Sequence, residues 1–154
     1  MTEEKFPVQS EPNQNRPLRT WFLAILTALY CLTVVILFAY SQVSMGSSIW
    51  PFPGIYFLEI VLFGSLSLVS VVKNCPAGQF AWNSLPWIGA GGLFAFVILG
   101  AWTIGFYLIP GMILSIVIGV IEDRRKKDNL PLHVILFLVA AIAQAAIVLL
   151  VLSI

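Results

Sequence analysis

The chain has 154 residues, of which 60% are hydrophobic and only 10% are charged, whereas about a quarter of the residues of a typical soluble protein are charged. Its mean hydropathy of +0.98 excludes a water-soluble fold, because apolar residues grouped in long blocks need lipid or one another as neighbours. Eight basic and seven acidic residues give a net charge of +1 and no basic face for nucleic acid. We therefore predict an all-α integral membrane protein.

The first segment, residues 1–19, contains three prolines among polar residues and shows no apolar periodicity. Such a segment cannot bury enough apolar surface to fold, so we predict a disordered cytoplasmic tail. The rest of the chain, residues 20–154, is predicted to form one transmembrane bundle without a soluble domain.

The longest apolar block, residues 85–121, decides the number of spans. As one helix its roughly 37 residues would measure about 55 Å, far more than a hydrocarbon core of about 30 Å, so it has to fold back. We place the turn at residues 103–110, because Gly105 permits a turn and Pro110 suits the first position of a helix. The polar breaks elsewhere then give five predicted spans: 20–41, 55–72, 85–102, 110–121 and 131–153.

The positions of the basic residues favour five spans over four. Lys and Arg near a membrane concentrate on the cytoplasmic side. Five spans with a cytoplasmic N-terminus place all eight basic residues inside, whereas four spans would divide them four and four. The eight residues are Lys5, Arg16, Arg19, Lys73, Arg124, Arg125, Lys126 and Lys127. We therefore predict a five-helix transmembrane bundle with its C-terminus outside.

Glu59 is the only acidic residue inside a predicted span, about four residues and roughly 6 Å from its outer end. A carboxylate in lipid is costly, so we expect protonation, a hydrogen-bonding partner or a water-filled cavity to offset the cost. Ser70 shares the helical face of Glu59, because eleven residues complete about three turns. Ser70 alone is too sparse for a proton relay, so the partner of Glu59 has to come from another helix or subunit. Glu59 is either a functional site or a residue that is wetted from outside or ties two helices together.

The last span carries two polar residues, His133 and Gln144, which lie eleven residues apart and therefore on one face. We expect this face to point into protein. Gln144 is interpreted as a structural residue, because an amide in a membrane favours an interhelical hydrogen bond worth about 0.6 to 2 kcal/mol. His133 is interpreted as a residue of the membrane interface rather than a ligand or base, since a metal site needs convergent partners and the chain has no second His.

Small residues recur in the third and fourth spans, and small residues let helix backbones approach closely. We expect them to pack these two spans against each other as a tight hairpin. They are Gly89, Gly92 and Gly100 in the third span and Gly111, Ser115 and Gly119, at four-residue spacing, in the fourth.

The basic cluster after the fourth span, Arg124, Arg125, Lys126 and Lys127, is predicted to fix the orientation of the protein. Each basic residue beside a membrane is also attracted to anionic head groups by about 1 kcal/mol. Contact with lipid head groups is therefore an expected by-product of the topogenic role.

No assembled catalytic set, nucleotide motif or metal-ligand spacing occurs, so we expect no cofactor and favour a protein that is not an enzyme. Our leading hypothesis is an accessory, assembly or scaffold protein that acts through helix contacts with itself or a larger complex. The alternative is an oligomeric transporter or channel that uses Glu59 as a cation or proton site. An intramembrane enzyme is the least supported class. We expect the protein in the cytoplasmic membrane of a prokaryote.

Overall fold

The structure, a computed structural model, describes residues 18–48, 54–73, 80–101, 103–126 and 130–153. The first 17 residues of the predicted tail lie outside this part of the chain. The described residues form six helices and no strand. They are α1 (Leu18–Ser44), α2 (Gly54–Lys73), α3 (Phe80–Asn83), α4 (Leu85–Leu99), α5 (Gly105–Lys126) and α6 (Leu130–Leu152).

Four of the helices, α1, α2, α5 and α6, are long and apolar enough to cross a membrane. The fifth long element, α4, is apolar but has only 15 residues, which corresponds to roughly 22 Å. Helix α3 is a single turn before α4. The all-helical architecture predicted from the sequence is therefore confirmed for the described residues.

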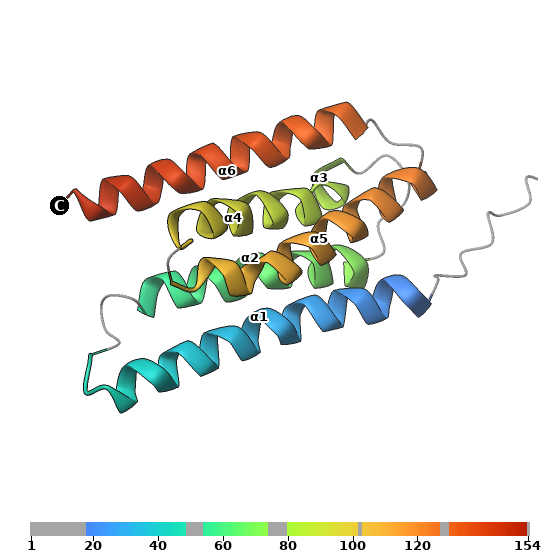
Figure 1. Ribbon diagram of the computed structural model, residues 1–154. Helices are drawn as coiled ribbons and strands as arrows, with labels where there is room; N and C mark the ends of the chain where they lie inside the picture. Colours follow the sequence, from blue (N-terminus) through green and yellow to red (C-terminus); the bar gives the residue numbers. More distant parts are fainter. Residues whose placement is uncertain (1–17, 49–53, 74–79, 102, 127–129, 154) are drawn as a thin grey trace, which may run out of the picture.

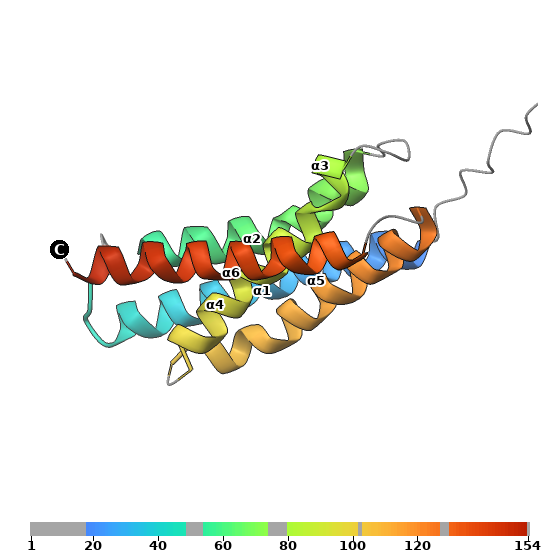
Figure 2. The ribbon, with the colours of Figure 1, turned by 90° about the horizontal axis from the view of Figure 1, so that it is seen from above.

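The five longer helices run alternately up and down, and α4 lies in the middle of the bundle (Figures 1 and 2). Helix α4 packs against α2, α5 and α6, while α1 packs against α2 and α5. Helix α6 lies at one side of the bundle and makes its main contact with α4.

The two ends of the bundle differ in charge. We call one end, where α1 and α6 begin and α2 and α5 end, the basic end (right in Figure 1). Its described basic residues include Arg19, Lys73, Arg124 and Arg125. We call the opposite end the uncharged end, because the residues described there, 42–48, 54, 100, 101 and 103–109, include no charged residue.

Glycine residues explain why α4 fits between its neighbours. A Cβ atom on Gly89 would lie 2.7 Å from the carbonyl oxygen of Phe63 in α2, and one on Gly91 would collide with the carbonyl oxygen of Phe137 in α6. On the other side of α2, a Cβ atom on Gly64 would lie 2.7 Å from the Cβ atom of Cys31 in α1. Small residues at these positions let the backbones approach more closely than any side chain would permit.

The turn before α5 lies earlier in the chain than predicted. The amides of Thr103 and Gly105 donate hydrogen bonds of 2.8 and 2.7 Å to the carbonyl oxygen of Gly100, and α5 begins at Gly105. Pro110 is therefore inside α5 and does not open it, contrary to the prediction. Pro110 is the sixth residue of α5 and has no N–H to donate to the carbonyl oxygen of Phe106, yet the helix continues through it.

The small residues of the predicted third and fourth spans do not all face each other. Gly92 lies against the ring of Phe63 in α2, as Gly89 lies against its backbone. Gly111 lies against Cys31 and Tyr30 in α1. Gly119, against Trp87 of α4, and Gly100, at the turn, do belong to the contact between α4 and α5. The spacing identified faces of close approach, but each helix has several neighbours, and spacing alone does not choose among them.

Candidate functional site

Glu59 and Gln144 meet at the side of the bundle. The Nε2 atom of Gln144 donates a hydrogen bond of 2.7 Å to Oε2 of Glu59. Gln144 is buried and Glu59 is half-buried. The partner of Glu59 is thus supplied by another helix of the same chain, one of the two sources expected from the sequence. The pair joins α2 to α6, which have few other contacts with each other.

Ser70 does not take part in this pair. It lies near the opposite end of α2, and its hydroxyl donates a hydrogen bond of 2.8 Å to the carbonyl oxygen of Trp82 in α3. Eleven residues of helix separate Ser70 from Glu59 by roughly 16 Å. The shared helical face is real, but the two residues serve contacts at different ends of the bundle.

A second polar group, which we call the basic-end cluster, consists of Trp87, Asp123 and His133. The indole Nε1 atom of Trp87 donates a hydrogen bond of 3.0 Å to Oδ2 of Asp123. The other carboxylate oxygen of Asp123 lies 2.9 Å from Nδ1 of His133. The imidazole is stacked on the indole, with ring centroids 6.4 Å apart and an interplanar angle of 11°. These contacts join α4, α5 and α6.

The basic-end cluster is fully inside the protein. The side chains of His133 and Asp123 are 0% and 1% exposed. His133 was interpreted as an interfacial residue, but its ring is enclosed between helices. A buried acid and base of this kind depend on each other, because removal of one leaves the other desolvated and without this contact.

Asp123 was not predicted as a site residue, because it lies in the charged run that follows the predicted fourth span. The signal that could have found it is the four-residue spacing of Gly111, Ser115 and Gly119, which continues to Asp123. Residues at this spacing share one helical face, and all four are buried. Gly119 also makes room for the cluster, since a Cβ atom there would lie 2.8 Å from Nε1 of Trp87.

Other polar and charged groups surround the basic-end cluster. Asn83, Ser84 and Glu122 are also buried at this end. The ammonium group of Lys73 lies 4.4 Å from the ring centroid of Trp82, within the range of a cation–π interaction. Three of the four basic residues that the sequence assigned to orientation and lipid head groups, Arg124 to Lys126, form the last turn of α5. Arg124 and Arg125 are exposed, Lys126 ends the helix, and Lys127 lies outside the described residues.

The region between the two polar sites is apolar. Along α6, Phe137 lies against Phe94 of α4, with ring centroids 5.5 Å apart, and Ala140 lies close to Gly91. A weak hydrogen bond of 3.3 Å between the hydroxyls of Ser67 and Ser115 joins α2 to α5. The hydrogen bond of the Glu59–Gln144 pair and that of Trp87 with Asp123 share no residue.

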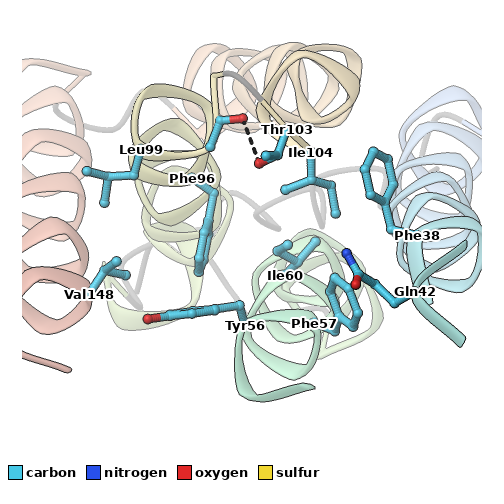
Figure 3. A pocket seen from close by; sticks show the side chains of 11 residues that line it. Phe38, Gln42, Tyr56, Phe57, Ile60, Phe96, Leu99, Thr103, Ile104 and Val148 are labelled. Carbon is cyan, nitrogen blue, oxygen red and sulfur yellow. Dashed lines mark hydrogen bonds between the residues drawn. The ribbon is translucent and has the colours of Figure 1, made fainter. Parts of the chain in front are cut away.

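A cavity of about 330 Å³ lies at the uncharged end, bounded by α1, α2, α4, α6 and the turn before α5 (Figure 3). Its walls are mainly aromatic and aliphatic. The lining residues are Phe38, Gln42, Tyr56, Phe57, Ile60, Phe96, Leu99, Gly100, Thr103, Ile104 and Val148. Glu59 does not line the cavity, although its sequence neighbours Tyr56 and Ile60 do.

In the described part of the chain, no three His, Cys, Asp or Glu side chains converge where they could hold a metal ion. Cys31 is buried in the apolar core and forms no disulfide.

No protein-family model matches this chain, and no characterised protein or solved structure shows significant similarity to it.

Proposed function

We propose that this chain is a multi-pass protein of the cytoplasmic membrane that acts as an accessory, assembly or scaffold component through contacts between helices. The observation that carries this proposal is that the polar side chains inside the bundle contact other helices. Glu59 bonds to Gln144, Asp123 to Trp87 and His133, and Ser70 to the backbone of α3. Each of these contacts joins different helices of the described bundle, which is the common structural use of polar side chains in membrane helices.

The proposed orientation has five crossings, with the basic end in the cytoplasm and the C-terminus outside. It is supported by the described basic residues Arg19, Lys73, Arg124 and Arg125, which belong to helix ends on one side of the bundle, and by the absence of charge in the segments at the other end. This distribution follows the positive-inside rule. Helix α4, although short, is enclosed by α2, α5 and α6 and therefore needs less lipid-facing length than its neighbours.

Thiol labelling and a C-terminal reporter test this topology. We expect a membrane-impermeant maleimide to reach Cys75, which lies outside the described residues, only from the cytoplasmic side. Cys31 is 0% exposed and should stay unlabelled until the protein unfolds. A C-terminal reporter that is active in the cytoplasm would overturn the five-span orientation.

Helix α6 is the proposed contact helix. It lies at the side of the bundle, and its outward residues are exposed and apolar, for example Ile142, Ile147 and Leu150. Among them, Ala143 and Ala146 are exposed small residues one turn apart, which would let a helix of a second molecule approach closely.

Native mass spectrometry of the protein released from membranes in mild detergent tests this function. We expect an assembly heavier than the 17.0 kDa chain. Ala143→Trp should reduce the assembled fraction about fivefold or more, because it blocks close helix approach. The matched control is Leu29→Trp on the exposed side of α1, which should leave assembly unchanged. A monomeric, partner-free particle under all mild conditions would contradict the proposal.

A transporter or channel is the second candidate, and one observation favours it. Glu59 is half-buried in α2, one helical turn from Tyr56, which lines the cavity at the uncharged end. If Glu59 binds a cation or proton, Glu59→Gln should abolish a proteoliposome flux while the protein still folds. A flux that survives this substitution unaltered would eliminate the role of Glu59.

A further inference from the structure

The cavity at the uncharged end has the size and lining of a ligand site. Its volume of about 330 Å³ falls in the range of small-molecule pockets, about 300 to 1,000 Å³. It is also larger than an engineered apolar cavity of about 150 Å³ that stays dry and accepts an aromatic guest. Phe38, Phe57 and Phe96 form much of its wall (Figure 3). A space of this kind favours an apolar chain or ring over water.

The polar side chains of the lining are those of Gln42, Tyr56 and Thr103, and we assign the amide of Gln42 as the polar point of the cavity. Gln42, in the last turns of α1, is half-buried, and its amide projects into the space between Phe38 and Phe57 (Figure 3). Its side chain forms no hydrogen bond with any other described residue. An amide offers both donors and an acceptor, so it is complementary to a hydroxyl or a carbonyl group.

The lining residues also restrict the charge of the ligand. None of them is Asp, Glu, Lys, Arg or His. An ionised head group placed here would lose its hydration without gaining a counter-ion, which is strongly unfavourable. The complementary ligand is therefore uncharged, with an apolar body and one or a few neutral polar atoms.

We propose that this cavity binds a neutral amphiphile, with its apolar chain or ring among Phe38, Phe57 and Phe96 and its hydroxyl or carbonyl bonded to Gln42. The membrane supplies molecules of this chemistry directly to helices embedded in it. The proposal is independent of assembly through α6, because all the residues that line the cavity belong to a single chain.

Photolabelling in proteoliposomes tests the site, with a diazirine-bearing dodecanol as the probe. We expect saturable labelling of peptides that line the cavity and competition by unlabelled dodecanol. Leu99→Trp should abolish the saturable labelling, since Leu99 is an exposed residue of the cavity lining and an indole there would block access to the cavity. The matched control is Ile98→Trp, at an adjacent position that is exposed like Leu99 but does not line the cavity, and it should retain labelling.

Two further measurements test the polar point and the charge. Gln42→Leu keeps a side chain of similar size, and it should weaken competition by dodecanol about fivefold through loss of one neutral hydrogen bond. Dodecanoate, measured at a pH where it is ionised, should compete far less well than dodecanol. Both measurements remain decisive if Leu99→Trp fails to fold.

Three outcomes would overturn the proposal. The first is labelling that does not saturate or is equal in Leu99→Trp and Ile98→Trp. The second is competition by dodecanoate as strong as that by dodecanol, which would contradict the proposal that the ligand is uncharged. The third is unchanged competition in Gln42→Leu, which would show that the ligand forms no hydrogen bond with Gln42. None of these outcomes depends on the oligomeric state.

Discussion

The polar side chains at the two ends of the bundle differ in their burial and in their partners. At the basic end, Trp87, Asp123 and His133 come from three helices and enclose one another almost completely. At the uncharged end, Glu59 is only half-buried and is bonded to Gln144, and a cavity lies nearby. The basic end is therefore a junction of three helices, whereas the uncharged end contains a cavity between the helices.

Helix α6 shows the same difference along its own length. His133 anchors it at the basic end and Gln144 anchors it eleven residues later. Between these points the helix touches α4 through Phe137 and Ala140, where Gly91 allows close approach. The residues facing away are apolar and exposed, so helix α6 is held by its packing against α4 together with the polar contacts of His133 and Gln144.

The largest expected effect is at the basic end. Asp123→Ala removes the acceptor of the Trp87 indole and the partner of His133, leaving both buried without it. Because loss of the carboxylate removes one buried contact from each of two enclosed polar groups, the free energy of unfolding should fall by about 3 to 5 kcal/mol. Unfolding in mixed micelles with increasing sodium dodecyl sulfate measures this loss.

The control for Asp123 is its exposed neighbour, Arg124→Ala, which should change the free energy of unfolding by less than about 0.5 kcal/mol. Equal and small losses for the two variants would mean that the basic-end cluster is not a junction that stabilises the bundle.

The Glu59–Gln144 pair should give a smaller effect in the same unfolding measurement. Gln144→Leu removes an interhelical hydrogen bond, and the expected loss is about 1 kcal/mol. Glu59→Gln keeps an acceptor oxygen for Gln144 and should cost less. A double-mutant cycle with Glu59→Leu and Gln144→Leu should give a coupling energy of about 0.6 to 2 kcal/mol, and additive effects would show that the two side chains do not act together.

The smallest effect concerns the apolar middle of the bundle. The hydroxyls of Ser67 and Ser115 are 3.3 Å apart, a long distance for this type of bond, so Ser67→Ala should cost about 0.5 kcal/mol. Ser65→Ala is the control on the same helix, because the hydroxyl of Ser65 bonds only to the carbonyl oxygen of Leu62 one turn away. A loss at Ser67 as large as that at Asp123 would remove the contrast between the middle and the basic end.

The pair at the uncharged end was partly predictable. Glu59 and Gln144 stand out as polar residues inside apolar blocks, and the eleven-residue spacing correctly placed His133 and Gln144 on a buried face of the last helix. Their partners were not predictable, because periodicity along one helix says which residues share a face and nothing about the helix opposite. Asp123 was predicted to lie in a charged loop because of its charge and its basic neighbours, but it lies on the buried face of α5.

The cavity was not predictable from the sequence at all. Its lining residues come from four helices and a turn, and each of them, taken alone, is an ordinary residue of an apolar span. A space between helices depends on how closely their backbones approach, which is decided by contacts such as that of Gly64 with Cys31.

The sequence by itself determined the helical apolar class, the accumulation of basic residues at one end and the polar positions that need partners. These properties follow from hydrophobicity, charge and the period of the helix, all of which act locally along the chain. Only the tertiary structure decided that Glu59 meets Gln144, that Asp123 joins Trp87 to His133, and that a cavity remains at the uncharged end. These depend on which helices are neighbours, and that choice is made by the combined fit of many side chains over the whole bundle.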